Sequence, residues 1–227
     1  NYQTLREELI AAGHTFTTKS DTEVLLHGYE QWGVDLLQRV RGMFTFVIWD
    51  KNKQELFGAR DHFGIKPFYY AKMNGTFMYA SEIKSLLRHP DFVKELNAEA
   101  LKPYMTFQYP AIGETFFKGV YKLPEGHYFT YRDGKMDIHR YYDEDFREGK
   151  QKLGELVNSI DQTVCDSVKA HQIADVEVGS FLSSGVDSSY VAAVARPQHT
   201  YSIGFGKGTY NESQQAGELA ELLKLNN

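Results

Sequence analysis

The stretch that decides how this chain is interpreted is a serine-rich loop, which reads Phe181-Leu182-Ser183-Ser184-Gly185-Val186-Asp187-Ser188-Ser189. An apolar, β-branched run precedes it and an alanine- and valine-rich run follows it, so the pattern predicts a strand, a small-residue loop and a helix. The first N–H groups of such a helix lack helical partners and favour an anion. Gly185 and the serine hydroxyls would let a phosphate approach the backbone closely. The stretch therefore predicts a phosphate-binding loop.

The loop differs from the common Walker type, in which a lysine before the Ser/Thr reaches the β- and γ-phosphates. No lysine occurs between Lys169 and Lys207, so the loop is poorly equipped for γ-phosphoryl transfer. Its serines together with Asp187 resemble the pyrophosphate loop of ATP-pyrophosphatases, enzymes that form adenylates. An ordinary strand–turn–helix with serines at the helix cap has the same local pattern, and the loop alone leaves both interpretations open.

The composition is that of an ordinary globular protein, with 227 residues, 42% hydrophobic and 24% charged, which is long enough for one large domain or for one domain and part of another. The net charge of −5 argues against nucleic acid and against an anionic membrane as partners. No apolar run approaches the ~20 residues of a membrane span. With a single cysteine and no visible signal peptide, we expect a cytoplasmic protein without a disulfide framework.

The first part of the chain has helical periodicity. Ser20 and Glu23 have the capping-box spacing at the start of one of the expected helices. The elements expected here are helices at 4–12, 20–33 and 34–40 and a short polar strand at 15–19.

From residue 41 the hydrophobic period changes to two, which predicts strands. Residues 44–49 are apolar on both faces, so we expect this strand to be buried on both sides. Asn74-Gly75 and Asp133-Gly134 are strong hairpin signals. The expected strands are 44–49, 55–60, 68–73, 76–80, 115–121, 127–132 and 137–142, and the expected helices are 82–88 and 98–107, the second interrupted by Pro103.

Residues 143–152 are charged and have no periodic apolar face, which makes them the best candidate for a linker. Beyond them helices and strands alternate, which predicts a parallel sheet of the nucleotide-binding kind. The expected elements are helices at 153–168, 188–195 and 212–223 and strands at 176–182 and 200–205.

Six motifs, taken in order, resemble those of glutamine-hydrolysing asparagine synthetase of the bacterial B type. They are Gly42–Asp50 (GMFTFVIWD), Ala59–Tyr70 (ARDHFGIKPFYY), Tyr79–Leu87 (YASEIKSLL), Lys122–His127 (KLPEGH), the serine-rich loop and Tyr201–Phe205 (YSIGF). The resemblance covers nearly the whole chain.

The resemblance implies two domains. Residues 1–145 would form a class II glutamine amidotransferase domain, an N-terminal nucleophile domain with a four-layer αββα sandwich, which hydrolyses glutamine to ammonia. Residues 152–227 would begin an α/β parallel-sheet ATP-pyrophosphatase domain. There ATP, with Mg²⁺, would activate the side-chain carboxylate of aspartate as an adenylate, pyrophosphate would leave, and ammonia would displace AMP to give asparagine. The implied small-molecule partners are glutamine, aspartate and ATP, and a homodimer is compatible with the assignment.

The resemblance also assigns residues to sites. Asp21 falls on the acidic position that holds the α-ammonium of glutamine, although helix capping within Ser20–Glu23 would also explain it. Asp187 is the candidate for contact with Mg²⁺ through the pyrophosphate. Ser184 departs from the commoner Ser-Gly-Gly form, which bears on the loop geometry. The positions expected to contact ATP are Leu182, Ser183, Ser184, Gly185, Asp187, Ser188, Ser189 and Ile203.

Other polar residues favour structural interpretations. Arg60, Asp61 and Lys66 look like a charged turn between buried strands. Glu82 could cap a helix, and Cys165, internal and on an expected helix, is interpreted as a core residue. The eight histidines show no metal-ligand spacing.

The family's cysteine nucleophile is residue one of the mature chain, and the resemblance places it upstream of Asn1. We therefore expect an internal fragment that carries no glutaminase catalytic residue and is inactive by itself. Two alternatives stay open: a related adenylating amidotransferase-type enzyme, such as a β-lactam synthetase, and a non-catalytic nucleotide-binding module.

Overall fold

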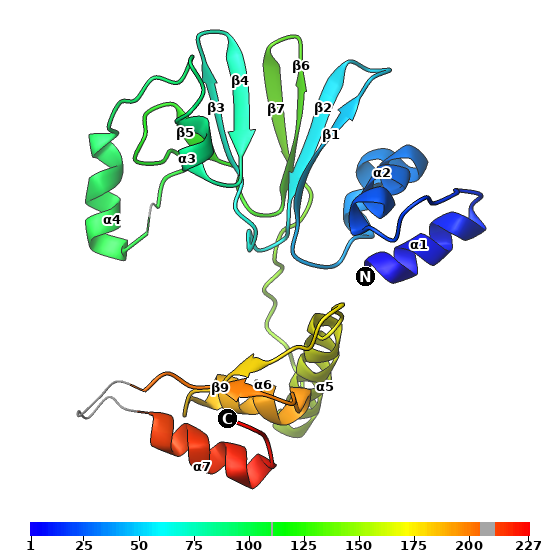
Figure 1. Cartoon of the computed structure of the whole chain (residues 1–227), viewed down its shortest axis with the longest axis vertical. Coiled ribbons are helices and arrows are strands. Elements are labelled where there is room, and N and C mark those ends of the chain that lie inside the picture. The colour runs from blue at the N-terminus through cyan, green and yellow to red at the C-terminus, as the bar shows by residue number, and fades with distance from the viewer. Residues whose placement is uncertain (110, 205–211) are drawn as a thin grey trace. The chain divides into compact units, whose positions relative to one another are not determined.

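The computed structural model describes residues 1–109, 111–204 and 212–227. The chain divides into two compact units, Asn1–Phe146 and Arg147–Asn227 (Figure 1). Residues 141–152 form no helix or strand.

The first unit contains a four-stranded antiparallel sheet in the order β1-β2-β6-β7. The inner strand β2 is well buried, whereas the edge strand β1 is not: Trp49 on β1 is 48% exposed and Phe57 on β2 is 1% exposed. The strand expected at 44–49 is partly buried on both faces: Phe46 and Ile48 pack against one buried cluster and Val47 against another, while Trp49 is exposed. The strands are β1 (Thr45–Asp50), β2 (Glu55–Arg60), β6 (His127–Arg132) and β7 (Lys135–Arg140).

A second sheet has the order β4-β3-β5, with β3 (Tyr69–Met73), β4 (Thr76–Ala80) and β5 (Val120–Lys122). The hairpin expected at Asn74-Gly75 is confirmed, and both turn residues have positive φ, 50° and 83°. The strand expected at 115–121 is limited to β5, because residues 115–117 form a turn in which the Thr115 hydroxyl accepts from the Phe117 N–H at 3.2 Å.

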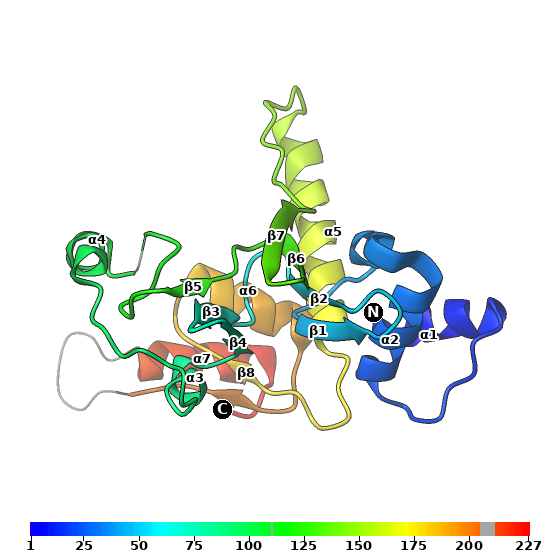
Figure 2. The ribbon, with the colours of Figure 1, turned by 90° about the horizontal axis from the view of Figure 1, so that it is seen from above.

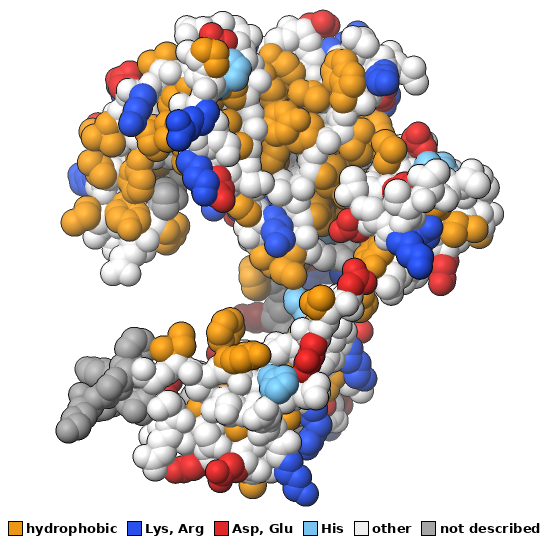
Figure 3. All heavy atoms as spheres, viewed as in Figure 1, with side chains coloured by type: hydrophobic (Ala, Val, Ile, Leu, Met, Phe, Trp, Pro, Cys, Tyr) orange, Lys and Arg blue, Asp and Glu red, His pale blue; other side chains and the backbone are white. Residues whose placement is uncertain are grey.

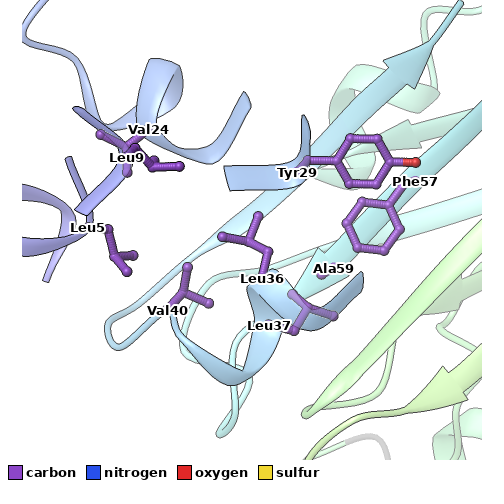
Figure 4. Close-up of a cluster of buried hydrophobic side chains, with 9 residues drawn as sticks. All are labelled: Leu5, Leu9, Val24, Tyr29, Leu36, Leu37, Val40, Phe57 and Ala59. Atoms are coloured by element: carbon purple, nitrogen blue, oxygen red, sulfur yellow. The ribbon is translucent and has the colours of Figure 1, made fainter. Parts of the chain in front are cut away.

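Helices cover one face of the four-stranded sheet through a buried apolar cluster (Figure 4). Its members are Leu5, Leu9, Val24, Tyr29, Leu36, Leu37, Val40, Phe57 and Ala59. The helices are α1 (Tyr2–Ala11), α2 (Asp21–Trp32) and the 3₁₀ helix η1 (Gly33–Gln38), the last in place of the helix expected at 34–40.

The two sheets pack against each other through aromatic side chains. The Phe77 ring on β4 stacks on the Tyr131 ring on β6 with centroids 4.2 Å apart, and Phe129 and Phe68 lie in the same cluster. The short helix α3 (Ile83–Leu86) lies beside β4 (Figure 2). Its Leu86 side chain packs on the second sheet. The region expected to be one helix at 98–107 is a 3₁₀ turn, η2 (Ala98–Ala100), followed by α4 (Leu101–Phe107) with Pro103 in its first turn.

The start of α2 differs from a capping box. Ser20 Oγ accepts from the Thr22 N–H at 3.1 Å, but the Glu23 carboxylate accepts from the N–H groups of Thr17 and Thr18, at 2.7 and 2.6 Å. These bonds hold the pKa of Glu23 at about 2, the bond from the Thr17 N–H contributing most. The strand expected at 15–19 was wrong, because the N–H groups of Thr17 and Thr18 bind this carboxylate instead of a neighbouring strand.

In the second unit two short strands, β8 (Ser180–Phe181) and β9 (Thr200–Tyr201), pair in parallel as the alternating pattern predicts. They are shorter than expected: Val176 is 78% exposed, and Phe205 lies outside the described residues. The described residues of the unit form the helices α5 (Leu153–His171), α6 (Val186–Ala195) and α7 (Ser213–Leu223).

No helix in the described ranges is long and apolar enough to cross a membrane. On the face shown in Figure 3, positive and negative side chains are interspersed over both units and do not separate into fields of one sign. This distribution agrees with the small net charge of −5.

Candidate functional site

The serine-rich loop lies at the carboxyl edge of the parallel strand pair. Residues 182–185 connect β8 to α6, and Ser202 follows β9 at the same edge. The Ser202 hydroxyl donates to the Leu182 carbonyl at 2.7 Å, which joins the ends of the two strands. Open α/β sheets bind ligands outside the carboxyl ends of their strands, and this edge is therefore the candidate site of the second unit.

Serine hydroxyls hold the loop in its conformation. The Ser183 and Ser188 oxygens are 2.7 Å apart and hydrogen-bonded, and Ser183 Oγ also accepts from the Gly185 N–H at 3.2 Å. Ser189 Oγ donates to the Gly185 carbonyl at 2.7 Å. Ser184 does not adopt the left-handed conformation, so a serine fits at this position without backbone strain.

The start of α6 offers free donors. Gly185 caps the helix without a side-chain hydrogen bond, and the first helical bond runs from the Ser189 N–H to the Gly185 carbonyl. Among the described residues, the N–H groups of Val186, Asp187 and Ser188 therefore have no protein acceptor. Together with the exposed hydroxyl of Ser184, they are suited to an anion.

A hollow of about 330 Å³ adjoins the loop, a volume typical of small-molecule sites. One part of its lining is apolar and the other consists of hydroxyls and a carboxylate. The lining residues are Phe181, Leu182, Ser183, Ser188, Tyr201, Ser202, Ile203, Glu212 and Ser213. The structure thus brings four of the expected ATP residues, Leu182, Ser183, Ser188 and Ile203, to one cavity. A larger hollow of about 430 Å³ lies along α4 and contains none of the expected site residues.

Asp21 is the first residue of α2 and is exposed. The capping acceptor is Ser20, while the Asp21 carboxylate is 3.4 and 3.5 Å from the hydroxyls of Ser20 and Thr22. Helix capping therefore does not occupy this carboxylate, which leaves it available to a cation.

In the charged turn after β2, Arg60 and Asp61 are buried, whereas Lys66 is exposed. Arg60 is 2% exposed and Asp61 is 1% exposed. The Arg60 guanidinium donates to the carbonyls of Lys66 and Leu123, each at 2.7 Å, and to that of Gly64 at 2.5 Å. The Arg60 side chain thus satisfies three main-chain carbonyl groups, which gives it a structural role in the first unit.

Two ionisable side chains beside this turn, His62 and Tyr141, have pKa values shifted from their ordinary values. Burial lowers the pKa of His62 below its ordinary value, with the Asp61 charge opposing. The Tyr141 hydroxyl donates to the Arg60 carbonyl at 2.7 Å, and burial raises the pKa of that hydroxyl. His62 and Tyr141 contact each other edge to face, with ring centroids 5.4 Å apart.

Two further expectations are corrected. Glu82 stands at the N-cap of α3, but its side chain makes no capping bond and pairs with Lys84 instead. Cys165 is half-buried on α5, with its Sγ 4.0 Å from Asp161 Oδ1, and it belongs to none of the buried clusters of the described chain.

The eight histidines show no metal-ligand spacing along the sequence, but the fold brings two of them beside a carboxylate. His14, His27 and Glu30 bring three donor atoms together, all within 4.8 Å of one another. The i, i+3 spacing of His27 and Glu30 on α2 could have signalled two of the three members, whereas His14 joins them from the preceding loop.

Comparison with known proteins assigns the first unit. Residues 1–142 match the glutamine amidotransferase domain family. The chain belongs to this family. Beyond the amidotransferase domain, residues 159–227 match the asparagine synthase family.

Two of the curated relatives are named as asparagine synthetases and a third as an amidase. Asparagine synthetase [glutamine-hydrolyzing] 1 of Bacillus subtilis is 42% identical over 232 residues, which cover 100% of the chain and 37% of that relative. The putative asparagine synthetase [glutamine-hydrolyzing] 2 of Methanocaldococcus jannaschii is 33% identical over 94% of the chain and 42% of its own length. Amidase chry2 of Gibberella zeae is 34% identical over 79% of the chain and 27% of its own length.

The resemblance to glutamine-hydrolysing asparagine synthetases is thereby confirmed. The chain spans about a third of the length of the relatives that it matches, 37% and 35% for two of those from Bacillus subtilis. A solved glutamine phosphoribosylpyrophosphate amidotransferase of B. subtilis shares 20% identity over 92% of the chain and 44% of its own, with a TM-score of 0.43, and this likeness adds nothing to the assignment.

Proposed function

We propose that the protein carrying this sequence is a ligase that makes asparagine from aspartate, with ammonia from glutamine and energy from ATP. A carboxylate oxygen of aspartate attacks the α-phosphorus of ATP, the bond to the β-phosphate breaks and pyrophosphate leaves. Ammonia then attacks the acyl carbon of the adenylate and AMP leaves with the bonding electron pair.

The observation that carries the proposal is the position of the serine-rich loop. It lies at the carboxyl edge of a parallel strand pair, beside a cavity of about 330 Å³, in the same chain as an amidotransferase domain. A hydroxyl-lined loop without a lysine suits a departing pyrophosphate better than a transferred γ-phosphoryl group.

The residues of the loop fit ATP in two ways. The unpartnered N–H groups at the start of α6 and the Ser184 hydroxyl are suited to the pyrophosphate, while the Ser183–Ser188 pair fixes the loop conformation. The apolar side chains of Leu182 and Ile203 line the cavity where a base would bind.

The metal and the remaining loop residues complete this site. Gly185 keeps the backbone accessible, and Ser189 supports the first helical turn through its bond to the Gly185 carbonyl. Mg²⁺ would neutralise charge on the pyrophosphate, and Asp187, exposed on α6, is the carboxylate placed to hold it.

In the first unit we assign Asp21 to the α-ammonium of glutamine. Two observations support this assignment: the Asp21 carboxylate is exposed, and the capping hydrogen bond of α2 is accepted by Ser20 and not by Asp21. The packing of helices, two sheets and a further helix supports the four-layer αββα architecture of an N-terminal nucleophile domain. On this proposal residues 1–145 provide the glutaminase domain and residues 152–227 belong to the adenylating domain.

The test is the identity of the nucleotide product. A full-length protein that contains these 227 residues, supplied with glutamine, aspartate, ATP and Mg²⁺, should release AMP and pyrophosphate in equal amounts. Release of ADP and phosphate would contradict the proposed chemistry. If AMP release needs a carboxylate other than aspartate, the adenylation stands and the acceptor assignment falls.

Two variants separate the sites. Asp187→Ala should lower pyrophosphate release by about 100-fold and leave glutaminase activity unchanged, since losing one group that stabilises transition-state charge has effects of that order. Asp21→Ala should do the reverse, with glutamine hydrolysis lost and ammonia-dependent synthesis kept. Asp175→Ala, exposed in the same unit as Asp187, is the matched control and should change neither rate.

A further inference from the structure

Two imidazoles and a carboxylate converge beside α2 in the first unit. His14 lies in the connection between α1 and α2, and His27 and Glu30 lie three residues apart on α2. The two histidines are largely buried, 17% and 18% exposed, while the Glu30 side chain is 54% exposed. One side of the cluster is thus fixed by packing and the other is open to solvent.

The three donor atoms form a compact triangle. His14 Nδ1 and His27 Nδ1 are 3.3 Å apart, His27 Nδ1 and Glu30 Oε2 are 2.8 Å apart, and His14 Nδ1 and Glu30 Oε2 are 3.8 Å apart. The circle through these atoms has a radius of about 2.0 Å, close to the 2.0–2.2 Å at which Zn²⁺ binds nitrogen and carboxylate oxygen. A zinc ion just outside this plane would contact all three atoms at ordinary bond lengths.

An outer partner orients the His14 ring for such a role, and a carboxylate lies near the His27 ring. Gln31 Oε1 lies 2.9 Å from His14 Nε2 and can accept its proton, which leaves a lone pair on Nδ1. The Glu23 carboxylate lies 3.8 Å from His27 Nε2. Metal-binding histidines characteristically direct the second ring nitrogen to an oxygen acceptor, and His14 does so here, while the Glu23 carboxylate beside His27 is beyond hydrogen-bond distance.

From this geometry we propose that His14, His27 and Glu30 form a binding site for Zn²⁺ or a similar divalent transition cation. Two imidazoles favour such ions over Mg²⁺ and Ca²⁺, which prefer ligand sets made of oxygen. Three protein ligands leave the fourth tetrahedral position to water.

The site would act on the segment before α2. His14 belongs to that segment, whereas His27 and Glu30 are fixed on the helix, so the ion crosslinks residue 14 to α2. The same segment contains Thr17 and Thr18, which are already bound to Glu23, and it ends at the start of α2. Metal binding would therefore add a second link between this segment and α2, besides the hydrogen bonds from Thr17 and Thr18 to Glu23. This effect on rigidity does not depend on any activity in either unit.

The competing interpretation is a hydrogen-bond network without a metal, since the same distances allow one imidazole to donate to the other and to Glu30. The two interpretations differ in one measurable property. A hydrogen-bond network has no stoichiometric affinity for zinc.

The experiment is a titration of the full chain, without a histidine tag, with ZnCl₂ against a chromophoric chelator, in the presence of millimolar MgCl₂. One equivalent of Zn²⁺ should bind and should raise the melting temperature of the protein. Co²⁺ in place of Zn²⁺ should give the visible absorption of a four-coordinate ion. Absence of saturable Zn²⁺ binding would overturn the proposal.

Variants locate the ion. Glu30→Gln removes one ligand charge at a half-exposed position, so the fold is kept, and it should weaken Zn²⁺ binding by at least about 10-fold. His27→Ala should have a larger effect and remove the Co²⁺ absorption. His89→Ala is the control, because His89 faces one carboxylate at 3.9 Å without a third donor in the described structure. Equal affinity in the wild type, His27→Ala and Glu30→Gln would place the ion elsewhere and refute the site.

Discussion

The buried carboxylate of Asp61 allows a quantitative prediction. Its Oδ1 accepts from the N–H groups of Phe63 and Ile65 at 3.2 and 2.9 Å, and its Oδ2 from those of Phe44 and Lys66 at 3.3 and 2.9 Å. Asp61→Asn keeps one of these oxygens and replaces the other by an NH₂ group, which cannot accept. Two hydrogen bonds to a charged acceptor are lost, and at about 1.5 kcal/mol each they cost about 3 kcal/mol of unfolding free energy.

Urea unfolding followed by tryptophan fluorescence measures this loss in the right part of the chain. Both tryptophans, Trp32 and Trp49, belong to the first unit, so their signal is insensitive to the second. With a slope of about 2 kcal/mol/M, the unfolding midpoint should fall by about 1.5 M. Asp133→Asn is the matched control, since Asp133 occupies an exposed turn with a φ of 51° that asparagine adopts equally well.

A shift for Asp61→Asn no larger than that for Asp133→Asn would refute the reasoning. It would mean that the four N–H groups find other acceptors at no cost, and that the turn after β2 is held by Arg60 alone. A changed slope would instead indicate that the variant unfolds in more than one step, and the midpoint would then need a second probe.

Three further outcomes follow from the structure. Gly58→Ala should destabilise the first unit by about 1–3 kcal/mol in the same urea assay, because a Cβ there would lie 2.3 Å from a Phe129 ring carbon, whereas Gly113→Ala, with open space, should cost less than about 0.5 kcal/mol. Proton NMR should show His62 titrating with a pKa below the 6.5 of an ordinary histidine, so its contribution to stability is complete above pH 6.5 and is lost as the pH falls through the lower folded pKa; titration at or above 6.5 would contradict its burial. Ser20→Ala should lower the stability of the first unit by about 1 kcal/mol, and no loss would mean that the Thr22 N–H does not depend on this cap.

Local signals predicted much of the fold. The hairpin at Asn74-Gly75 and the alternation in residues 76–80 are decided by neighbouring residues, and both agree with the structure. The position of β1 at the sheet edge is not local: it depends on β6, which pairs with the far side of β2. The sequence of residues 44–49 carries no information about which of two adjacent apolar strands receives that partner.

The turn at Arg60 shows the same limit. The sequence indicates a charged turn between buried strands, but nothing near it in the sequence signals that Arg60 and Asp61 are themselves buried. The guanidinium is buried because it reaches the Leu123 carbonyl, 63 positions along the chain, and because Tyr141 covers the Arg60 carbonyl. Contacts between residues far apart in the sequence therefore determine that Arg60 is buried.

At the candidate loop, the sequence indicated the order of elements and the hydroxyl chemistry. The contribution of Ser202 became evident with the parallel pairing of β8 and β9, which brings it to the Leu182 carbonyl. The cluster of His14, His27 and Glu30 was not predicted for a similar reason. His14 lies in the loop before α2, and the sequence spacing does not show that this loop folds back onto the helix.

The placement of β2 inside its sheet also bears on how the chain is made. β2 ends at Arg60, but its second neighbour, β6, begins at His127. At a synthesis rate of ~5–20 residues per second, the free edge of β2 waits roughly 3–13 s on the ribosome before its partner emerges. During that interval an apolar strand edge is open to incorrect pairing, which makes this the stage at which the nascent chain is most exposed to aggregation and most dependent on chaperones.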